Sequence, residues 1–138
     1  MPKEIFPGRY DSLGKIAQLV NRATQELGLD SCEAYGVETA VDEACSNIIE
    51  HSYKGEDRGN IEVSYRVTEN VLTFEIKDTG QRFYPKKVPK LNAKATLRYR
   101  EKHGLGLYFM YQWMDEIIFD YIEGQNILTM VKRKNQEA

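Results

Sequence analysis

A glutamate and an asparagine one helical turn apart are the residues of this sequence best suited to chemistry. Glu43 and Asn47 are four positions apart, and His51 follows after four more. On a helix this spacing stacks side chains on one face. A carboxylate can accept a proton and a carboxamide oxygen can ligate a hard cation, two functions that phosphoryl transfer requires. Ordinary amphipathic helices often show the same spacing, so the rest of the chain must decide between the two interpretations.

A second candidate is an aspartate followed by a glycine at the end of a predicted strand. Asp78-Thr79-Gly80 directly follows the alternating apolar run at 72–77. The glycine would let a flat ligand approach the backbone, and a carboxylate in a pocket is a strong acceptor for an amino group such as that of adenine. Asp-x-Gly is also a favoured turn sequence, so this motif alone does not establish a site.

A third candidate is the Gly104-Leu105-Gly106 sequence at the start of a predicted helix. Free backbone N–H groups and the positive end of the helix dipole can bind phosphate there, although a Gly-x-Gly by itself is weak evidence. Lys102 and His103 would add positive charge, or would be solvated surface residues. Between 80 and 103 the pattern dissolves into a basic segment with two prolines, which is typical of a functional loop or lid.

The elements that would position these groups alternate between helical and extended periodicity. Asp11 or Ser12 is expected to cap the first helix, and Asp30 or Ser31 the second. Helices packed on one face of a mostly antiparallel sheet define an α+β two-layer sandwich. The sequence predicts helices at roughly 12–28, 31–53 and 104–114, and strands at roughly 5–9, 61–65, 72–77, 116–122 and 126–133.

Composition excludes several classes of protein. At 138 residues we expect a single domain over 1–138 with one core. The net charge of −2, with both signs spread along the chain, argues against a nucleic-acid partner. No apolar run is long enough to span a membrane, and the N-terminus lacks a signal-peptide core. Cys32 and Cys45 fall in one predicted helix, where they could not bridge each other, and are expected to be reduced core residues of a cytoplasmic protein.

The motifs, in this order, resemble those of the Bergerat-fold ATPases, the superfamily of gyrase, heat-shock chaperones, histidine kinases and MutL. More closely, the chain is similar to the bacterial anti-sigma regulatory factors with serine-protein kinase activity. Residues 42–53 resemble their N box, and residues 78–85 match their Asp-x-Gly-x-x-Phe-x-Pro adenine box. Residues 104–107 resemble their glycine-rich helix start, and residues 124–132 their final strand. The resemblance covers nearly the whole chain and implies a histidine-kinase-like ATPase fold.

The resemblance implies ATP and Mg²⁺ as cofactors and gives individual residues roles. Asn47 would hold Mg²⁺, Asp78 would bind adenine, and Glu43 would accept the proton of a serine or threonine hydroxyl as the γ-phosphoryl group moves. Asn126 stands where relatives place Thr near the adenine, and Arg82 where many members carry a second glycine. Nucleotide binding is further implied for Gly80, His103, Gly104, Leu105, Gly106 and Leu107.

The same resemblance implies protein partners. The substrate would be a small anti-sigma-factor antagonist, and a sigma factor would be the alternative client, so that phosphorylation switches partners. Family members often form homodimers, for which the first helix and strand are the candidate interface. One rival interpretation is a non-catalytic ATP-dependent adaptor that sequesters a partner, against which Glu43 argues because a pure binder needs no base. Another, a detached histidine-kinase catalytic domain, is weaker because nothing resembles phosphoacceptor helices.

Overall fold

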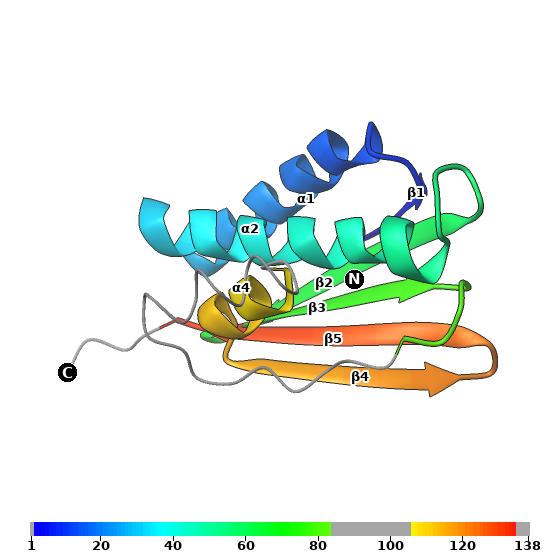
Figure 1. The fold of residues 1–138 in the computed structure, drawn as a ribbon. Helices are drawn as coiled ribbons and strands as arrows, with labels where there is room; N and C mark the ends of the chain where they lie inside the picture. Colours follow the sequence, from blue (N-terminus) through cyan, green and yellow to red (C-terminus); the bar gives the residue numbers. More distant parts are fainter. Residues whose placement is uncertain (1, 84–105, 135–138) are drawn as a thin grey trace, which may run out of the picture.

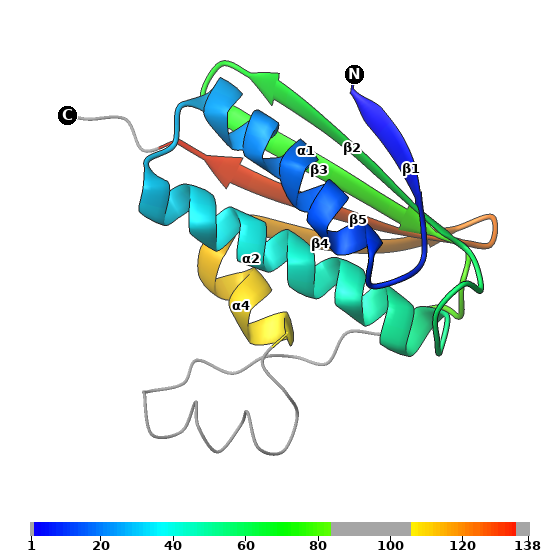
Figure 2. The same ribbon diagram turned by 90° about the horizontal axis from the view of Figure 1, so that it is seen from above.

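Helices cover one face of an antiparallel sheet in the computed structural model, which describes residues 2–83 and 106–134. Figures 1 and 2 show helices α1 (Ser12–Leu27), α2 (Ser31–Asn47) and α4 (Gly106–Trp113) lying on the same side of the five-stranded sheet. The α+β two-layer sandwich expected from the sequence is therefore confirmed. In the described part of the chain, no helix is both long and apolar enough to cross a membrane.

The strand order brings together segments that lie far apart in the sequence. The sheet contains β1 (Lys3–Pro7), β2 (Asn60–Thr68), β3 (Val71–Asp78), β4 (Glu116–Ile122) and β5 (Gln125–Arg133), in the order β1-β2-β3-β5-β4. Every neighbouring pair is antiparallel. The β3–β5 register places Asp78 opposite Asn126 at one end of the two strands. β1 is an edge strand, where Pro7 can stand because its missing N–H does not interrupt the ladder.

The second helix departs from its expected course at its C-terminal end. Asp30 caps α2 as expected, because its Oδ1 accepts from the Glu33 N–H at 2.8 Å, whereas Asp11 makes no capping hydrogen bond for α1. The predicted helix to residue 53 is α-helical only to Asn47 and then widens into the π-helical turn η1 (Ile48–Ser52). The Tyr53 N–H reaches back five residues to the Ile48 carbonyl at 2.8 Å.

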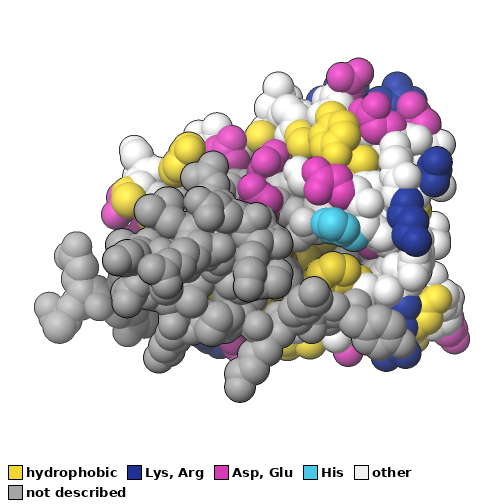
Figure 3. Space-filling view, viewed as in Figure 1, with side chains coloured by type: hydrophobic (Ala, Val, Ile, Leu, Met, Phe, Trp, Pro, Cys, Tyr) yellow, Lys and Arg dark blue, Asp and Glu magenta, His cyan; other side chains and the backbone are white. Residues whose placement is uncertain are grey.

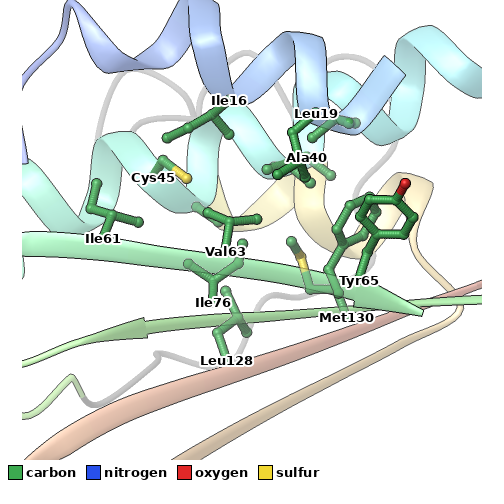
Figure 4. Packing of buried hydrophobic residues seen from close by; sticks show 14 of the residues in the cluster. Ile16, Leu19, Ala40, Cys45, Ile61, Val63, Tyr65, Ile76, Leu128 and Met130 are labelled. Carbon is green, nitrogen blue, oxygen red and sulfur yellow. The ribbon is translucent and has the colours of Figure 1, made fainter. Parts of the chain in front are cut away.

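The core lies between the helices and the covered face of the sheet (Figure 4). Cys45 is part of it, and burial raises the pKa of its thiol, so this cysteine is an inert apolar group. The prediction that Cys32 is a core residue is wrong, because this cysteine is exposed in the first turn of α2. Apolar side chains from both layers interdigitate, including Ile16, Leu19, Ala40, Ile61, Val63, Ile76, Leu128 and Met130.

A glycine allows α4 to pack closely on α2. A Cβ at Gly36 would lie 2.1 Å from indole atoms of Trp113, so only a residue without a side chain fits. The Lys132 ammonium donates to the Trp113 carbonyl at 3.2 Å and lies 3.6 Å from the Glu33 carboxylate. These contacts fix the C-terminal end of α4 against α2 and β5.

Candidate nucleotide-binding site

A pocket opens between the C-terminal part of α2, the η1 turn, α4 and one end of the central strands. Asn47, Asp78 and Asn126, which come from three separate segments of the sequence, all line it. The structure thus brings together three of the residues predicted from the sequence. The remaining described lining residues are mostly apolar: Ala44, Ile48, Ser52, Phe83, Met110, Phe119, Asp120, Ile127 and Leu128. Apolar walls with a few convergent polar groups are typical of small-molecule sites.

Asp78 is a buried carboxylate whose charge is compensated by hydrogen bonds. Only 4% of the residue is exposed. Its Oδ1 accepts from the Ser52 hydroxyl at 2.5 Å, the Gly80 N–H at 2.9 Å and the Asn126 amide at 2.9 Å. Burying a carboxylate is costly unless donors replace its water shell, and three donors do so here.

Gly80 is required by the packing of the protein on itself. A Cβ at this position would lie 2.4 Å from the Ser52 hydroxyl oxygen and 2.5 Å from the Ser52 carbonyl oxygen. The next residue, Gln81, donates its N–H to that carbonyl at 2.8 Å. Gly80 is not among the described residues that line the pocket. The approach of a flat ligand to this glycine stays a prediction, and the group that approaches it in this structure is Ser52 of the π-helical turn, with both its hydroxyl and its backbone.

Asn126 connects the carboxylate to the segment that follows it. Its Nδ2 donates to Asp78 Oδ1, to the Ser52 hydroxyl at 3.1 Å and to the Gln81 carbonyl at 2.9 Å. Its Oδ1 accepts from the Phe83 N–H at 2.9 Å. The Phe83 ring packs against Phe119 with centroids 5.2 Å apart. The amide therefore holds residues 81–83 in place and positions an aromatic side chain in the pocket wall.

Glu43 lies one turn before Asn47 but is not among the described residues that line the pocket. It is half-buried on α2. Burial raises the pKa of its carboxyl, and the negative charges of Asp42 and Glu50 raise it further. Figure 3 shows acidic side chains gathered over α2 on this face of the molecule. A raised pKa makes a carboxylate a better proton acceptor near neutral pH.

His51 does not continue the face formed by Glu43 and Asn47. The side chain is exposed and lies 3.8 Å from the Glu50 carboxylate. It does not line the pocket within the described residues. The α-helical spacing fails here because the π-helical turn intervenes, and Ser52 is the residue that the turn directs to the site.

Part of the predicted phosphate site lies outside the described residues. The residues of that site that are not described are His103, Gly104 and Leu105, and the same holds for Lys102 and most of the expected lid at 80–103. Gly106 and Leu107 begin α4, and Met110, one turn further, lines the pocket. Among the described side chains, no group of three or more His, Cys, Asp or Glu could hold a metal. One Asn oxygen is nonetheless consistent with Mg²⁺, which takes few protein ligands and completes its shell with phosphates and water.

Several pocket residues were not identified from the sequence. Phe119 and Met110 follow the alternation and the helical period of β4 and α4, so that periodicity could have marked them as inward-facing. Phe83 belongs to the adenine-box motif. Ser52 gave no such signal, because α-helical geometry does not predict where a π-helical turn directs it.

A two-layer fold with a pocket between the helices and the sheet, where a few polar side chains converge among apolar walls, is that of an ATPase domain of the histidine-kinase type. Residues 6–132 match the family described as the histidine kinase-like ATPase domain, and the chain belongs to this family. The family resemblance of the motifs is thereby confirmed.

Within the family, the chain is similar to proteins named serine-protein kinase RsbW. It is 28% identical to that of Bacillus thuringiensis over 127 residues, which cover 89% of this chain and 79% of the relative. It is 27% identical to that of Bacillus licheniformis over 135 residues, which cover 95% of this chain and 84% of the relative.

Solved structures agree on the fold. The structure of the RsbU and RsbW domains of a Mycobacterium tuberculosis protein matches with a TM-score of 0.65 and 16% identity, covering 96% of this chain and 32% of that one. The catalytic domain of histidine kinase ThkA matches with a TM-score of 0.54 and 12% identity, covering 99% of this chain and all of that domain. At these identities the likeness concerns the arrangement of helices and strands.

Proposed function

We propose that this protein is an ATP-dependent serine/threonine protein kinase that phosphorylates a small anti-sigma-factor antagonist. The main observation behind the proposal is that Asn47, Asp78 and Asn126 line one pocket. The chain also belongs to the family of histidine kinase-like ATPase domains. The relatives named serine-protein kinase RsbW support a protein, rather than a small molecule, as the phosphoryl acceptor.

The described residues fit the parts of an adenine nucleotide. Asp78 uses Oδ1 for three donors of the protein, and we assign its other carboxylate oxygen to the adenine amino group. Phe83 and Phe119 would pack against the flat base. Asn47 would hold Mg²⁺ by its side-chain oxygen, and the metal would neutralise charge on the phosphates. By resemblance, the phosphates would lie against the residues 103–107.

Glu43 is our candidate for the general base. It lies one turn from the Asn47 that lines the pocket, and its raised pKa suits proton transfer from a serine or threonine hydroxyl. The proton would pass to the Glu43 carboxylate as the hydroxyl oxygen bonds to the γ-phosphorus, and ADP would leave with the electrons of the broken bond. The acceptor hydroxyl would approach from the side of α2 where Glu43 lies.

The reaction would serve as a partner switch. The unphosphorylated antagonist and a sigma factor would compete for the kinase, and phosphorylation of the antagonist would return the kinase to the sigma factor. The switch requires ATP and both partners in one compartment, for which we propose the cytoplasm. We further propose a homodimer through β1 and α1, since β1 is an edge strand whose Ile5 is 61% exposed.

A second candidate function is a non-catalytic ATP-dependent adaptor. It is favoured by one observation, namely that Glu43 does not line the pocket within the described residues. An adaptor would bind ATP and a partner through the same surfaces but would have no need of the base.

Incubation with labelled ATP, Mg²⁺ and candidate antagonists distinguishes the two functions. For the kinase we expect a phosphoserine or phosphothreonine on one antagonist, and a rate lowered by about 10²–10⁴ in Glu43→Gln. The matched control is Glu38→Gln. Glu38 is another half-buried glutamate of α2, but it lies beside residues of α1, so its substitution should leave the rate unchanged. ATP binding without phosphorylation of any antagonist would favour the adaptor.

A further inference from the structure

The Ser52 side chain occupies the centre of the hydrogen-bond network beneath the pocket. The residue is only 6% exposed. Its hydroxyl donates to Asp78 Oδ1 at 2.5 Å, lies 3.2 Å from the Gln81 carbonyl and accepts from the Asn126 amide at 3.1 Å. It therefore contacts two of the polar side chains that line the pocket, those of Asp78 and Asn126. Neither the motifs nor their spacing gave this serine a role.

The π-helical turn is what brings Ser52 to this position. A turn closed from residue i to i+5 holds one residue more than an α-helical turn and so shifts the side chains that follow around the helix axis. The Ser52 carbonyl accepts the Gln81 N–H at 2.8 Å, and the Tyr53 hydroxyl accepts the Thr79 N–H at 3.0 Å. The end of the turn therefore holds the strand-end segment 78–81 through both side chains and backbone.

We propose that Ser52 is a positioning residue that fixes the Asp78 carboxylate for 6-amino purines and so contributes to selection of adenine over 6-oxo purines. The inference rests on the proposed binding of a nucleotide in this pocket. It gives Ser52 a role, and a contribution to base selection, that the resemblance does not assign to it.

The chemistry of the purine edge makes the orientation of Asp78 decisive. Adenine presents an amino donor at position 6, which a carboxylate oxygen accepts, whereas a 6-oxo purine presents an acceptor that the carboxylate repels. The Ser52, Gly80 and Asn126 donors all meet Oδ1, so they resist rotation of the carboxylate. Without the Ser52 donor the carboxylate gains rotational freedom, and both the attraction and the repulsion weaken.

A purely structural role for Ser52 makes a different prediction. If the hydroxyl only held the 78–81 segment in place, its removal would weaken the binding of every purine nucleotide by the same factor. The ratio of two affinities therefore separates the two roles. ADP and IDP suit this comparison because their bases differ at positions 6 and 1 of the purine edge and nowhere else.

The experiment is isothermal titration of ADP and of IDP, with Mg²⁺, into the wild type and Ser52→Ala. We expect the ADP affinity to fall about tenfold, which corresponds to the lower end of the free energy of one hydrogen bond to a charged group. The IDP affinity should not fall, because the repulsion of its 6-oxo group weakens. The matched control is Ser64→Ala, which removes a serine that is 7% exposed and bonded to the Glu75 carbonyl within the sheet. Both affinities should remain unchanged in this control.

Three results would overturn the inference. These are an unchanged ADP affinity in Ser52→Ala, equal losses for ADP and IDP, or a wild type that binds neither nucleotide. The last result would also overturn the proposed function, whereas the first two leave it standing. If Ser52→Ala does not fold, Ser52→Cys gives the same comparison, since a thiol fills the site but donates only weakly.

Discussion

Replacing Gly80 with alanine should disconnect the strand-end segment from the π-helical turn. The added Cβ would lie 2.4, 2.5 and 2.6 Å from three atoms of Ser52, two of which are backbone atoms that cannot swing away. An ordinary contact needs about 1 Å more in each case. A displacement of that size would lengthen the 2.8 Å bond from the Gln81 N–H to the Ser52 carbonyl beyond hydrogen-bonding range.

The free-energy cost follows from the bonds that are lost. One backbone hydrogen bond is worth about 1 kcal/mol, and the bond from Ser52 to the charged Asp78 carboxylate about 1.5–3 kcal/mol. We therefore expect Gly80→Ala to lower the free energy of unfolding by about 2.5–4 kcal/mol, measured by urea denaturation. We also expect weaker ADP binding, because the carboxylate loses its fixed orientation.

The matched control for this substitution is Gly14→Ala. Gly14 lies on the exposed face of α1, and a Cβ there would have no neighbour within 4 Å among the described residues. Alanine should stabilise the helix by about 0.5–1 kcal/mol. A Gly80→Ala protein that is as stable as the wild type and binds ADP equally well would refute the reasoning.

Three further predictions concern α2. Gly36→Ala should lower the melting temperature, because the added Cβ would overlap the Trp113 ring. A melting temperature by circular dichroism equal to that of the wild type would contradict the close packing of α4 on α2. Asn47→Ala should weaken binding of ATP with Mg²⁺ more than binding of ATP with EDTA, which titration calorimetry measures, and equal losses would remove Asn47 as a metal ligand. Since folding raises the pKa of Glu43, the folded state binds the extra proton, and stability falls as pH rises from the ordinary glutamate value through the raised one. Glu43→Gln should therefore melt higher than the wild type at pH 7 but not below about pH 4, the ordinary glutamate range.

The secondary structure was largely predictable because its local signals agree with the tertiary fold. The αL conformation of Gly28 ends α1, and the Asp30 side chain caps α2, as the residue types indicated. The hairpin between β2 and β3 turns at Glu69-Asn70, where the sequence changes from alternating apolar residues to polar ones. Each of these helix ends and turns depends on a few neighbouring residues.

The features that could not be predicted depend on contacts between distant residues. Motif order identified Asp78 and Asn126 separately, but only the placement of β5 beside β3 sets them opposite each other. The π-helical turn directs Ser52 to the carboxylate and leaves His51 at the surface, and its contacts are with the segment 78–81, which lies far away in the sequence. Cys32 and Cys45 share a helix, and its orientation in the fold decides that only the second is buried.

Calorimetric titration of ATP with Mg²⁺ into the wild type and Asp78→Asn tests the central claim most directly, because the claim is that this pocket binds the adenine. Asn keeps the shape of the side chain but removes the charge that strengthens its acceptor. We predict that the wild type binds and that Asp78→Asn binds with about 2 kcal/mol less free energy, a loss of roughly thirtyfold. Asp115→Asn, in the exposed connection before β4, is the matched control and should bind as the wild type does. Equal ATP affinity in the wild type and Asp78→Asn would contradict the account.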